Sequence, residues 1–395
     1  MLDVTKPKGA APFDTALLDR LMDAAGIDVL FATSKPNVQY LLGGHRSFFF
    51  ENMDAIGVTR YLPVVVYGKG APQKTGYFGH RMEGYQTELK PFWVSEINTK
   101  SSGAVDVIEK AAAYVRQFMN KPRRIGVELS FIPAATANAL RNAFPDAELA
   151  DALFVLERLR ARKTPEELEK LRLASDLVID SMLAVVKSHG VGATKEQMAE
   201  ALRREETMRG LIFDYCLIAA GSSHNRAPSE QRWGHGEPLS LDSGGNYQGY
   251  IGDLARMAVA GEPDSELVDL LDEVEAIQQA AFKPIRPGAL GGEIYTAADS
   301  VLHKSKLHNH IEFLAHGMGL VSHEAPRLTS SGPVPYDGYD ADKPLAAGMV
   351  ISVETTLLHP RRGFIKLEDT VAVTPAGCEI YGNRARGWNR AGGAA

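Results

Sequence analysis

The spacing of apolar residues alternates between helical and strand periods over the first 150 residues. From Ala16 to Gly26 apolar positions recur every three or four residues, which predicts an amphipathic helix, and the apolar stretch Ile27–Thr33 predicts a strand directly after it. The same reasoning predicts strands at 62–67 and 124–128 and helices near 104–118 and 134–144. This alternation is typical of a small α/β domain.

A charged segment at 157–163 separates this region from a long helix. Thr164 can cap the helix, Pro165 suits its first turn, and Glu167 completes a capping box. Thr194 and Gln197 begin a second helix in the same manner. We therefore predict a domain boundary here, with an N-terminal domain at 1–158 and a C-terminal domain at 159–395.

The pattern changes after Gly221, where strand-like segments are interrupted by two helical ones. Strands are predicted at 238–242, 250–259, 349–357 and 364–374, and helices around 265–283 and 292–305. The C-terminal domain is thus predicted to be α+β.

Composition excludes several classes of protein. The chain has 395 residues, of which 45% are hydrophobic and 23% charged, with a net charge of −6, as in compact globular proteins without a nucleic-acid partner. We find neither a signal-peptide pattern nor the roughly 20 apolar residues that cross a bilayer, so we expect a cytoplasmic protein with no membrane partner. Two cysteines, Cys216 and Cys378, make a disulfide framework implausible.

Four acidic residues occur in segments that otherwise predict buried strands. Asp242 ends an apolar stretch, Asp253 lies on the next strand, and Glu354 and Glu368 lie inside apolar runs. Each one taken singly could point to solvent from a half-exposed strand. Buried carboxylates together need compensation by protons, salt bridges or cations, and for four of them a pair of divalent metal ions is the simplest explanation. The stretch from His316 to Pro326 strengthens it, because it adds a second histidine, His323, and glycines that permit close backbone approach.

These segments resemble the pita-bread family of methionine aminopeptidases, Xaa-Pro peptidases (aminopeptidase P and prolidase) and creatinase. Asp242-Ser243-Gly244 and Gly249-Tyr250-Ile251-Gly252-Asp253-Leu254-Ala255-Arg256 are similar to the family's acidic hairpin, and the later blocks are His316-Gly317-Met318-Gly319, His323-Glu324-Ala325-Pro326, Gly348–Glu354 and Leu367-Glu368-Asp369. The N-terminal half resembles the creatinase-type amino domain. The resemblance implies a pita-bread catalytic domain preceded by that smaller α/β domain, in the Xaa-Pro peptidase and creatinase branch.

The resemblance also implies the ligand set. Asp242 would hold one metal ion, Asp253 and Glu368 would bridge both, and His316 with Glu354 would complete the second. Four carboxylates and one imidazole favour manganese, cobalt or iron, while zinc stays open, and we expect two divalent ions with manganese foremost. Two such ions can hold a bridging water or hydroxide and polarise the carbonyl that it attacks.

Three residues are expected to act on the substrate. His323 would stabilise the oxyanion as a hydrogen-bond donor, unless it is an ordinary loop histidine. Glu354 would shuttle the proton. His224 falls where relatives place a substrate-contacting histidine, but its neighbour Asn225 is equally eligible.

Other candidates carry weaker signals. Tyr250 and Arg256 match substrate-side positions of the family but could simply pack and pair within the hairpin. Pairs of histidine and arginine in the N-terminal half could reach a substrate across a homodimer, as amino domains of relatives do, or could be solvated surface residues: His45 with Arg46, and His80 with Arg81. The dimer itself is implied by the relatives alone.

The sequence departs from the proline-specific pattern at several positions. Thr355-Thr356 follows Glu354 in place of Pro-Gly, and Lys366 replaces a common Arg, so that a point charge stands where a planar fork is usual. Ala255 and Gly252 also differ from the usual residues.

Three functions remain open. The first is a metal-dependent hydrolase of Xaa-Pro dipeptides or short peptides. The second is a creatinase-like enzyme acting on a non-peptide small molecule, by amide or cyclic amidine hydrolysis such as ectoine opening or as a betaine or sulfonium lyase. The third is a catalytically silent binding protein, which the complete ligand set disfavours.

Overall fold

A computed structural model describes residues 10–53, 60–85, 88–89, 92–330 and 337–392 of the chain. The chain divides into two compact units, residues 1–160 and 161–395, so that the division falls two residues after the boundary predicted from the sequence.

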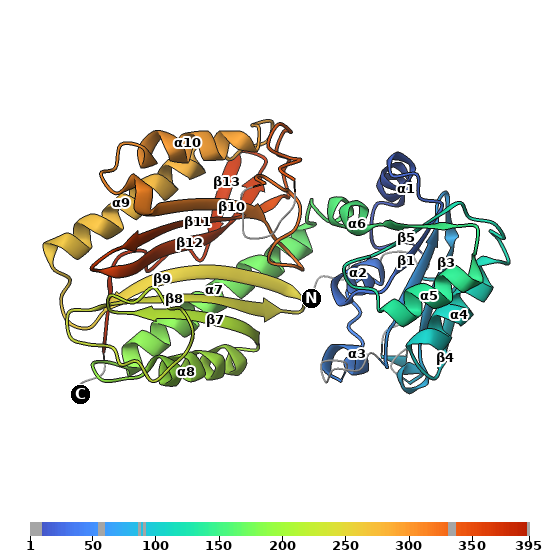
Figure 1. Cartoon of the computed structure of the whole chain (residues 1–395), viewed down its shortest axis with the longest axis horizontal. Helices are drawn as coiled ribbons and strands as arrows, with labels where there is room; N and C mark the ends of the chain where they lie inside the picture. Colours follow the sequence, from blue (N-terminus) through green and yellow to red (C-terminus); the bar gives the residue numbers. More distant parts are fainter. Residues whose placement is uncertain (1–9, 54–59, 86–87, 90–91, 331–336, 393–395) are drawn as a thin grey trace. The chain divides into compact units, whose positions relative to one another are not determined.

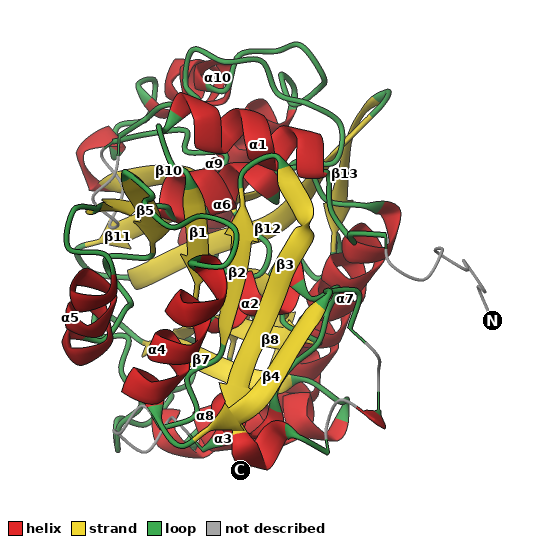
Figure 2. Cartoon of the chain, turned by 90° about the vertical axis from the view of Figure 1, so that its right-hand side faces the viewer, coloured by secondary structure: helices red, strands yellow, loops and turns green. Residues whose placement is uncertain are grey.

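The first unit is built on a six-stranded sheet in the order β4-β3-β2-β1-β5-β6. Figure 2 shows β2, β3 and β4 side by side. β1 pairs antiparallel with β2 and parallel with β5. The strands are β1 (Val29–Ala32), β2 (Val64–Gly68), β3 (Ala71–His80), β4 (Glu96–Ser101), β5 (Arg124–Val127) and β6 (Glu148–Asp151). The helices are α1 (Thr15–Ala24), α2 (Lys35–Leu41), α3 (Phe48–Asn52), α4 (Ala104–Val115), α5 (Ala134–Ala143) and α6 (Leu153–Leu159).

Both faces of this sheet are covered, because successive strand residues point to opposite sides. On β1, Val29 and Phe31 join one buried cluster with residues of α4 and α5. Leu30 and Ala32 join the other cluster with residues of α1 and α6. The strand is therefore apolar throughout rather than alternating, as expected of a strand buried on both faces.

The second unit contains an eight-stranded sheet with four long helices (Figure 1). Its central path runs β10-β11-β12-β9-β8-β7, with β13 beside β12 and β14 beside β9. The strands are β7 (Ile212–Ala220), β8 (Pro238–Tyr247), β9 (Tyr250–Val259), β10 (Ile311–Gly317), β11 (Val350–His359), β12 (Gly363–Thr374), β13 (Gly377–Tyr381) and β14 (Asn389–Arg390). The helices are α7 (Pro165–Ser188), α8 (Lys195–Met208), α9 (Ser265–Phe282) and α10 (Gly292–Leu302).

The helices pack on the sheet in two pairs. α7 and α8 contact β7, β8 and β9, whereas α9 and α10 contact β10, β11 and β12. Each pair forms its own buried apolar cluster with its strands.

The predicted helix starts are confirmed. α7 begins at Pro165 with a capping box between Thr164 and Glu167, and α8 follows a capping box between Thr194 and Gln197. The strands predicted at 238–242, 250–259, 349–357 and 364–374 correspond to β8, β9, β11 and β12. β7 and β10 were not predicted, and β10 carries His316. Within the described residues, no helix is both long and apolar enough to cross a bilayer.

Candidate metal centre

A tight hairpin brings the first two acidic residues together. Gln248 and Gly249, both at positive φ (54° and 96°), form the turn between β8 and β9. The strand register pairs Asp242 with Ala255 and Gly244 with Asp253. Because paired residues share a face and every second residue returns to it, Asp242 and Asp253 point to the same side of the sheet.

The register of the later strands places the other predicted ligands on that same side. Glu354 of β11 lies directly opposite Glu368 of β12, and Glu368 pairs with Ala255 of β9. His316 of β10 pairs with Ser352, two residues before Glu354. All five predicted ligands therefore converge on one face, from strands up to 126 positions apart in the sequence.

A cavity of about 300 Å³ opens over this face, near the lower end of the range for small-ligand pockets. It is lined by Tyr215, Leu217, Arg226, Asp242, Asp253, His316, Ser322, His323, Glu354, Lys366 and Glu368.

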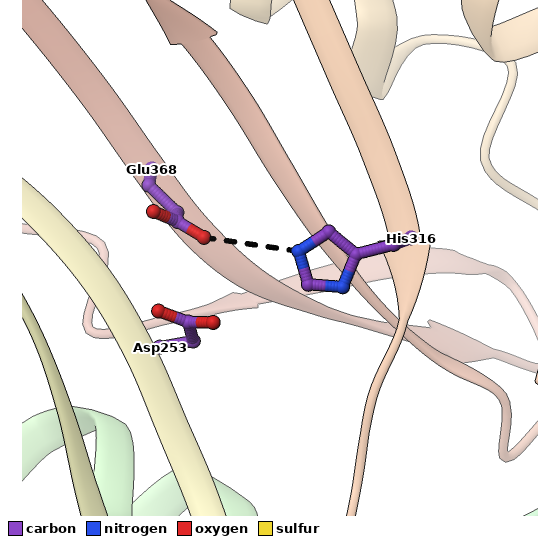
Figure 3. A group of neighbouring side chains, drawn as sticks. All are labelled: Asp253, His316 and Glu368. Atoms are coloured by element: carbon purple, nitrogen blue, oxygen red, sulfur yellow. Dashed lines mark ion pairs between the residues drawn. The ribbon is translucent and has the colours of Figure 1, made fainter. Parts of the chain in front are cut away.

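His316 provides the clearest sign that a cation belongs here. Burial lowers the pKa of His316 to about 4, so the ring is neutral, and its Nδ1 lies 3.3 Å from the carbonyl oxygen of Gly317, which assigns the proton to Nδ1. Among the described residues, Nε2 is buried without a hydrogen-bond partner. It faces Glu354 Oε1 at 3.6 Å. It also faces Glu368 Oε1 at 4.0 Å (Figure 3).

Two carboxylates and an unprotonated histidine nitrogen face one another here, and a bound cation would compensate all three. One ligand atom each of Asp253, His316 and Glu368 lies within 4.8 Å of the others. These separations suit an ion that takes nitrogen and oxygen ligands at about 2.1 Å. The residues present therefore fit the divalent ions that the resemblance implies.

The carboxylates show the cost of burial without such ions. Burial raises the pKa of Asp253 well above its usual value, and the nearby charges of Glu368 and Asp242 raise it further. Burial likewise raises the pKa of Asp242 and of Glu368. Tyr215 donates a hydrogen bond from its phenol to Asp253, and burial raises the pKa of Tyr215 as well. Bound cations would reverse this balance and favour the ionised carboxylates.

Lys366 lies inside the acidic cluster. Its Nζ donates to Asp242 Oδ2 at 2.7 Å and lies 2.6 Å from Glu354 Oε2 and 2.7 Å from Glu368 Oε2. Burial alone favours the neutral amine, but the carboxylates of Asp242, Glu368 and Glu354 outweigh it and raise the pKa of Lys366 well above its usual value.

His323 lines the cavity beside the ligands. Its ring stacks on that of His316, with centroids 3.8 Å apart and planes 16° apart, and burial lowers the pKa of His323 to about 4. A neutral imidazole in this position can donate a hydrogen bond into the cavity. The next residue, Glu324, is buried and accepts a hydrogen bond from Lys163 at 3.1 Å, which fixes the loop. Gly319 is required there, since a Cβ would overlap that pair.

Three predicted substrate contacts are not part of the cavity lining. His224 is exposed, and its Nε2 lies 3.2 Å from the carbonyl oxygen of His359. Tyr250 donates a hydrogen bond to Glu167 of α7 at 2.8 Å, and Arg256 donates to Asp369 at 2.7 Å. Tyr250 and Arg256 are each three positions from Asp253 on β9, so strand alternation turns them to the opposite face. The structure corrects these assignments: both residues pack within the fold.

The candidates of the first unit have local partners. His80 is buried against the ring of Tyr61 at 4.8 Å, which excludes a solvated surface position for it. The ring of His45 meets Phe92 at 4.5 Å, and Arg46 pairs with Glu51. Arg81 is exposed. The predicted reach across a dimer stays a prediction.

Tyr215 and Arg226 line the cavity, but the sequence reasoning did not single them out. Tyr215 lies on β7, the strand that was not predicted, and Asp214 next to it interrupts the apolar run and coincides with a register shift. Arg226 follows the strand in an irregular segment, with its Nη1 3.5 Å from Asp242 Oδ2. Only the pairing of β7 with β8 brings Tyr215 beside Asp253, so position in the sequence carried no signal for it.

A pocket in which four carboxylates and one imidazole meet above a mixed sheet defines the class of metal-dependent hydrolases. The chain belongs to metallopeptidase family M24, which residues 169–375 match, and residues 15–162 match the creatinase/prolidase N-terminal domain. The predicted fold, a pita-bread domain after a creatinase-type α/β domain, is confirmed, and the protein is a metallopeptidase.

Named relatives span both units. The Xaa-Pro dipeptidase of Pyrococcus furiosus is 28% identical over 347 residues, which cover 84% of this chain and 94% of that protein. A peptidase of Bacillus subtilis, YqhT, is 25% identical over 91% of this chain and 95% of its own. Among solved structures, the Xaa-Pro dipeptidase from Bacillus anthracis superposes with a TM-score of 0.79 at 22% identity, covering 95% of this chain and 98% of that one.

Proposed function

We propose that this metallopeptidase is an Xaa-Pro dipeptidase that uses two divalent ions, manganese foremost. The observation that carries the proposal is the convergence of Asp242, Asp253, His316, Glu354 and Glu368 on one face of the sheet, with the buried Nε2 of His316 lacking any described protein partner. The name and coverage of the Pyrococcus furiosus relative support the choice of substrate.

The position of each ligand residue on its strand decides which ion it would bind. Asp242 would hold one ion, His316 and Glu354 the other, and Asp253 and Glu368 both. When bound, the ions lower the pKa of a coordinated water and polarise the scissile carbonyl. Tyr215 keeps the Asp253 carboxylate oriented through its phenol hydrogen bond.

Two side chains would handle charge and protons during cleavage. His323, neutral and stacked on His316, would donate a hydrogen bond to the carbonyl oxygen as it gains negative charge. Glu354, with its side chain 14% exposed at the cavity wall, would take the proton of the attacking water and deliver it to the proline nitrogen. A cavity of about 300 Å³ favours a dipeptide over a longer chain.

The test is hydrolysis of a panel of Xaa-Pro dipeptides by protein stripped of metal and resupplied with manganese, cobalt or zinc. Turnover should require an added ion and should disappear in Asp253→Asn. Glu312→Gln is the matched control, because Glu312 is exposed on β10, the strand that carries His316. We expect this control to keep the wild-type rate.

The outcomes separate the functions left open by the sequence. An ion that binds tightly without cleavage of any Xaa-Pro dipeptide would exclude the dipeptidase and direct attention to small amides, cyclic amidines and betaines. Failure to bind any divalent ion would exclude both the dipeptidase and the metal-dependent enzyme with a non-peptide substrate. A homodimer and a cytoplasmic location remain part of the proposal, to be measured by light scattering and by cell fractionation.

A further inference from the structure

Lys366 is a cation placed where the proposed function needs a metal ion. Its side chain is only 4% exposed, and its ammonium nitrogen lies 2.6 to 2.7 Å from oxygens of three carboxylates, those of Asp242, Glu354 and Glu368. These three side chains come from three different strands, β8, β11 and β12. The ammonium therefore lies between these three carboxylates.

The two ends of the cluster are compensated unequally. Asp242 has Lys366 at 2.7 Å and the guanidinium of Arg226 at 3.5 Å, so that two cations approach the same oxygen. At the other end, His316 Nε2 is buried without a hydrogen-bond partner among the described residues, and it faces Oε1 of Glu354 and of Glu368, whereas Lys366 contacts Oε2 of each. The protein thus supplies positive charge at the Asp242 end and leaves the His316 end to an external ion.

We propose that the ammonium of Lys366 takes the place of the ion that Asp242 would otherwise hold. The wild-type chain then binds one divalent ion tightly, at His316, Asp253 and Glu368, and admits a second only by displacing Lys366. The inference rests on the proposed function in one respect, that the cluster binds divalent ions, and it makes entry of the second ion depend on displacement of Lys366.

The chemistry of lysine suits this role. An ammonium is a compact point charge, which can lie close to three carboxylate oxygens at once, as the Nζ of Lys366 does. An arginine at the same position would present a planar fork, which matches a single carboxylate side-on and leaves the centre of the group open. Lysine at position 366 therefore places its positive charge between the carboxylates, whereas arginine would place it beside one of them.

Charge balance favours one ion over two. The four carboxylates at the cavity carry four negative charges when ionised, and the Lys366 ammonium, the Arg226 guanidinium and one divalent ion together supply four positive charges. A second divalent ion would share the oxygens of Asp242 and Glu368 with the ammonium, and like charges at such distances in a buried site repel strongly.

The experiment measures bound metal directly. Wild-type protein is saturated with manganese chloride, passed through gel filtration, and analysed by inductively coupled plasma mass spectrometry. We expect about one manganese per chain in the wild type and about two in Lys366→Met, which removes the charge and keeps an unbranched side chain. Lys195→Met is the matched control: Lys195 is also buried, but its ammonium donates to the carbonyl of Asn225 at 2.7 Å, and we expect about one ion.

Each outcome decides the inference. Two ions retained by the wild type, or one ion retained by folded Lys366→Met, would overturn it while leaving the metallopeptidase function intact. No ion in the wild type would overturn the proposed function and the inference together. If Lys366→Met does not fold, anomalous diffraction from wild-type crystals grown with manganese replaces it. One peak beside His316, with Lys366 still between the carboxylates, supports the inference, and a second peak beside Asp242 overturns it.

Discussion

Two neighbouring residues of β12 face opposite environments. Asp369 points to the helix-covered side, where Arg256 donates to Oδ1 at 2.7 Å, Gln278 donates to Oδ2 at 2.6 Å, and Arg386 forms an ion pair with Oδ2. Both oxygens of that carboxylate therefore have partners within the protein. Glu368 points into the cavity, where it lies opposite Glu354 and shares one lysine with two other acids.

The difference distinguishes a buried charge that stabilises the fold from one that belongs to a binding site. Asp369 is compensated by arginines of the chain itself, one of which also pairs with Glu275, so the network needs nothing from outside. Around Glu368 acids outnumber the described cations, and a neutral histidine nitrogen adds a further acceptor. A buried acid is evidence for a ligand only when its surroundings leave it undercompensated.

The largest expected effect comes from removing a ligand on the cavity side. Asp253→Asn should lower kcat/KM by at least about 1,000-fold, equivalent to about 4 kcal/mol, because the ions are lost or misplaced. Metal-free Asp253→Asn should nevertheless unfold within about 0.5 kcal/mol of wild type. The reason is that burial disfavours the charged form of Asp253 in the metal-free protein, whereas asparagine is neutral and still accepts from Tyr215. Urea unfolding of both metal-free proteins checks this, and a large loss of stability would contradict it.

The opposite pattern is expected on the other face. Asp369→Asn leaves Arg256 with an uncompensated buried charge and removes one of the two carboxylates that pair with Arg386, which should lower the free energy of unfolding by about 3 kcal/mol. The measurement is urea unfolding with Glu312→Gln as an exposed control. Asp369→Asn that remains folded should still bind metal. Loss of metal from fully folded Asp369→Asn would show that the two faces of the sheet are not independent.

A cavity residue that is not a ligand sharpens the comparison. His323→Ala should reduce kcat about 100-fold, the usual loss for one oxyanion donor, while bound metal stays at the wild-type level. Steady-state kinetics together with metal analysis of the same sample test this. A parallel loss of metal would instead make His323 part of the ion's binding site.

The smallest effect concerns a buried acid on the helix-covered face. Glu206 accepts from Ser243, the neighbour of Asp242, at 2.9 Å, and burial raises the pKa of Glu206 to about 8. The folded state thus keeps a proton that the unfolded state releases near pH 4.5, so stability declines as pH rises from there through 8. Relative to wild type, Glu206→Gln should gain about 2 kcal/mol of stability between pH 5 and about pH 6.5. Thermal unfolding of both proteins at both pH values measures this change in stability. A stability difference between the two proteins that is equal at both pH values would contradict the raised pKa of Glu206.

Much of this architecture could be predicted from the sequence because local signals are strong here. The capping boxes before α7 and α8 indicated the helix starts correctly, and the apolar strands bearing single acids indicated residues that the structure brings to one face of the sheet. The substrate contacts fared worse for a physical reason. Tyr250 and Arg256 lie an odd number of positions from Asp253 on one strand, so the period of two turns them away from it, and that parity was available in the sequence.

The sequence by itself determined the types of residue in the site, the strands that carry most of them and the family to which they belong. Only the tertiary structure decided how the charges are compensated. Lys366 and Asp242 are 124 positions apart, and their contact at 2.7 Å exists because β9 joins β8 to β12 in one sheet. Electrostatic compensation acts over a few ångströms in a buried site, and such distances are set by strand register across the whole unit, which local patterns do not contain.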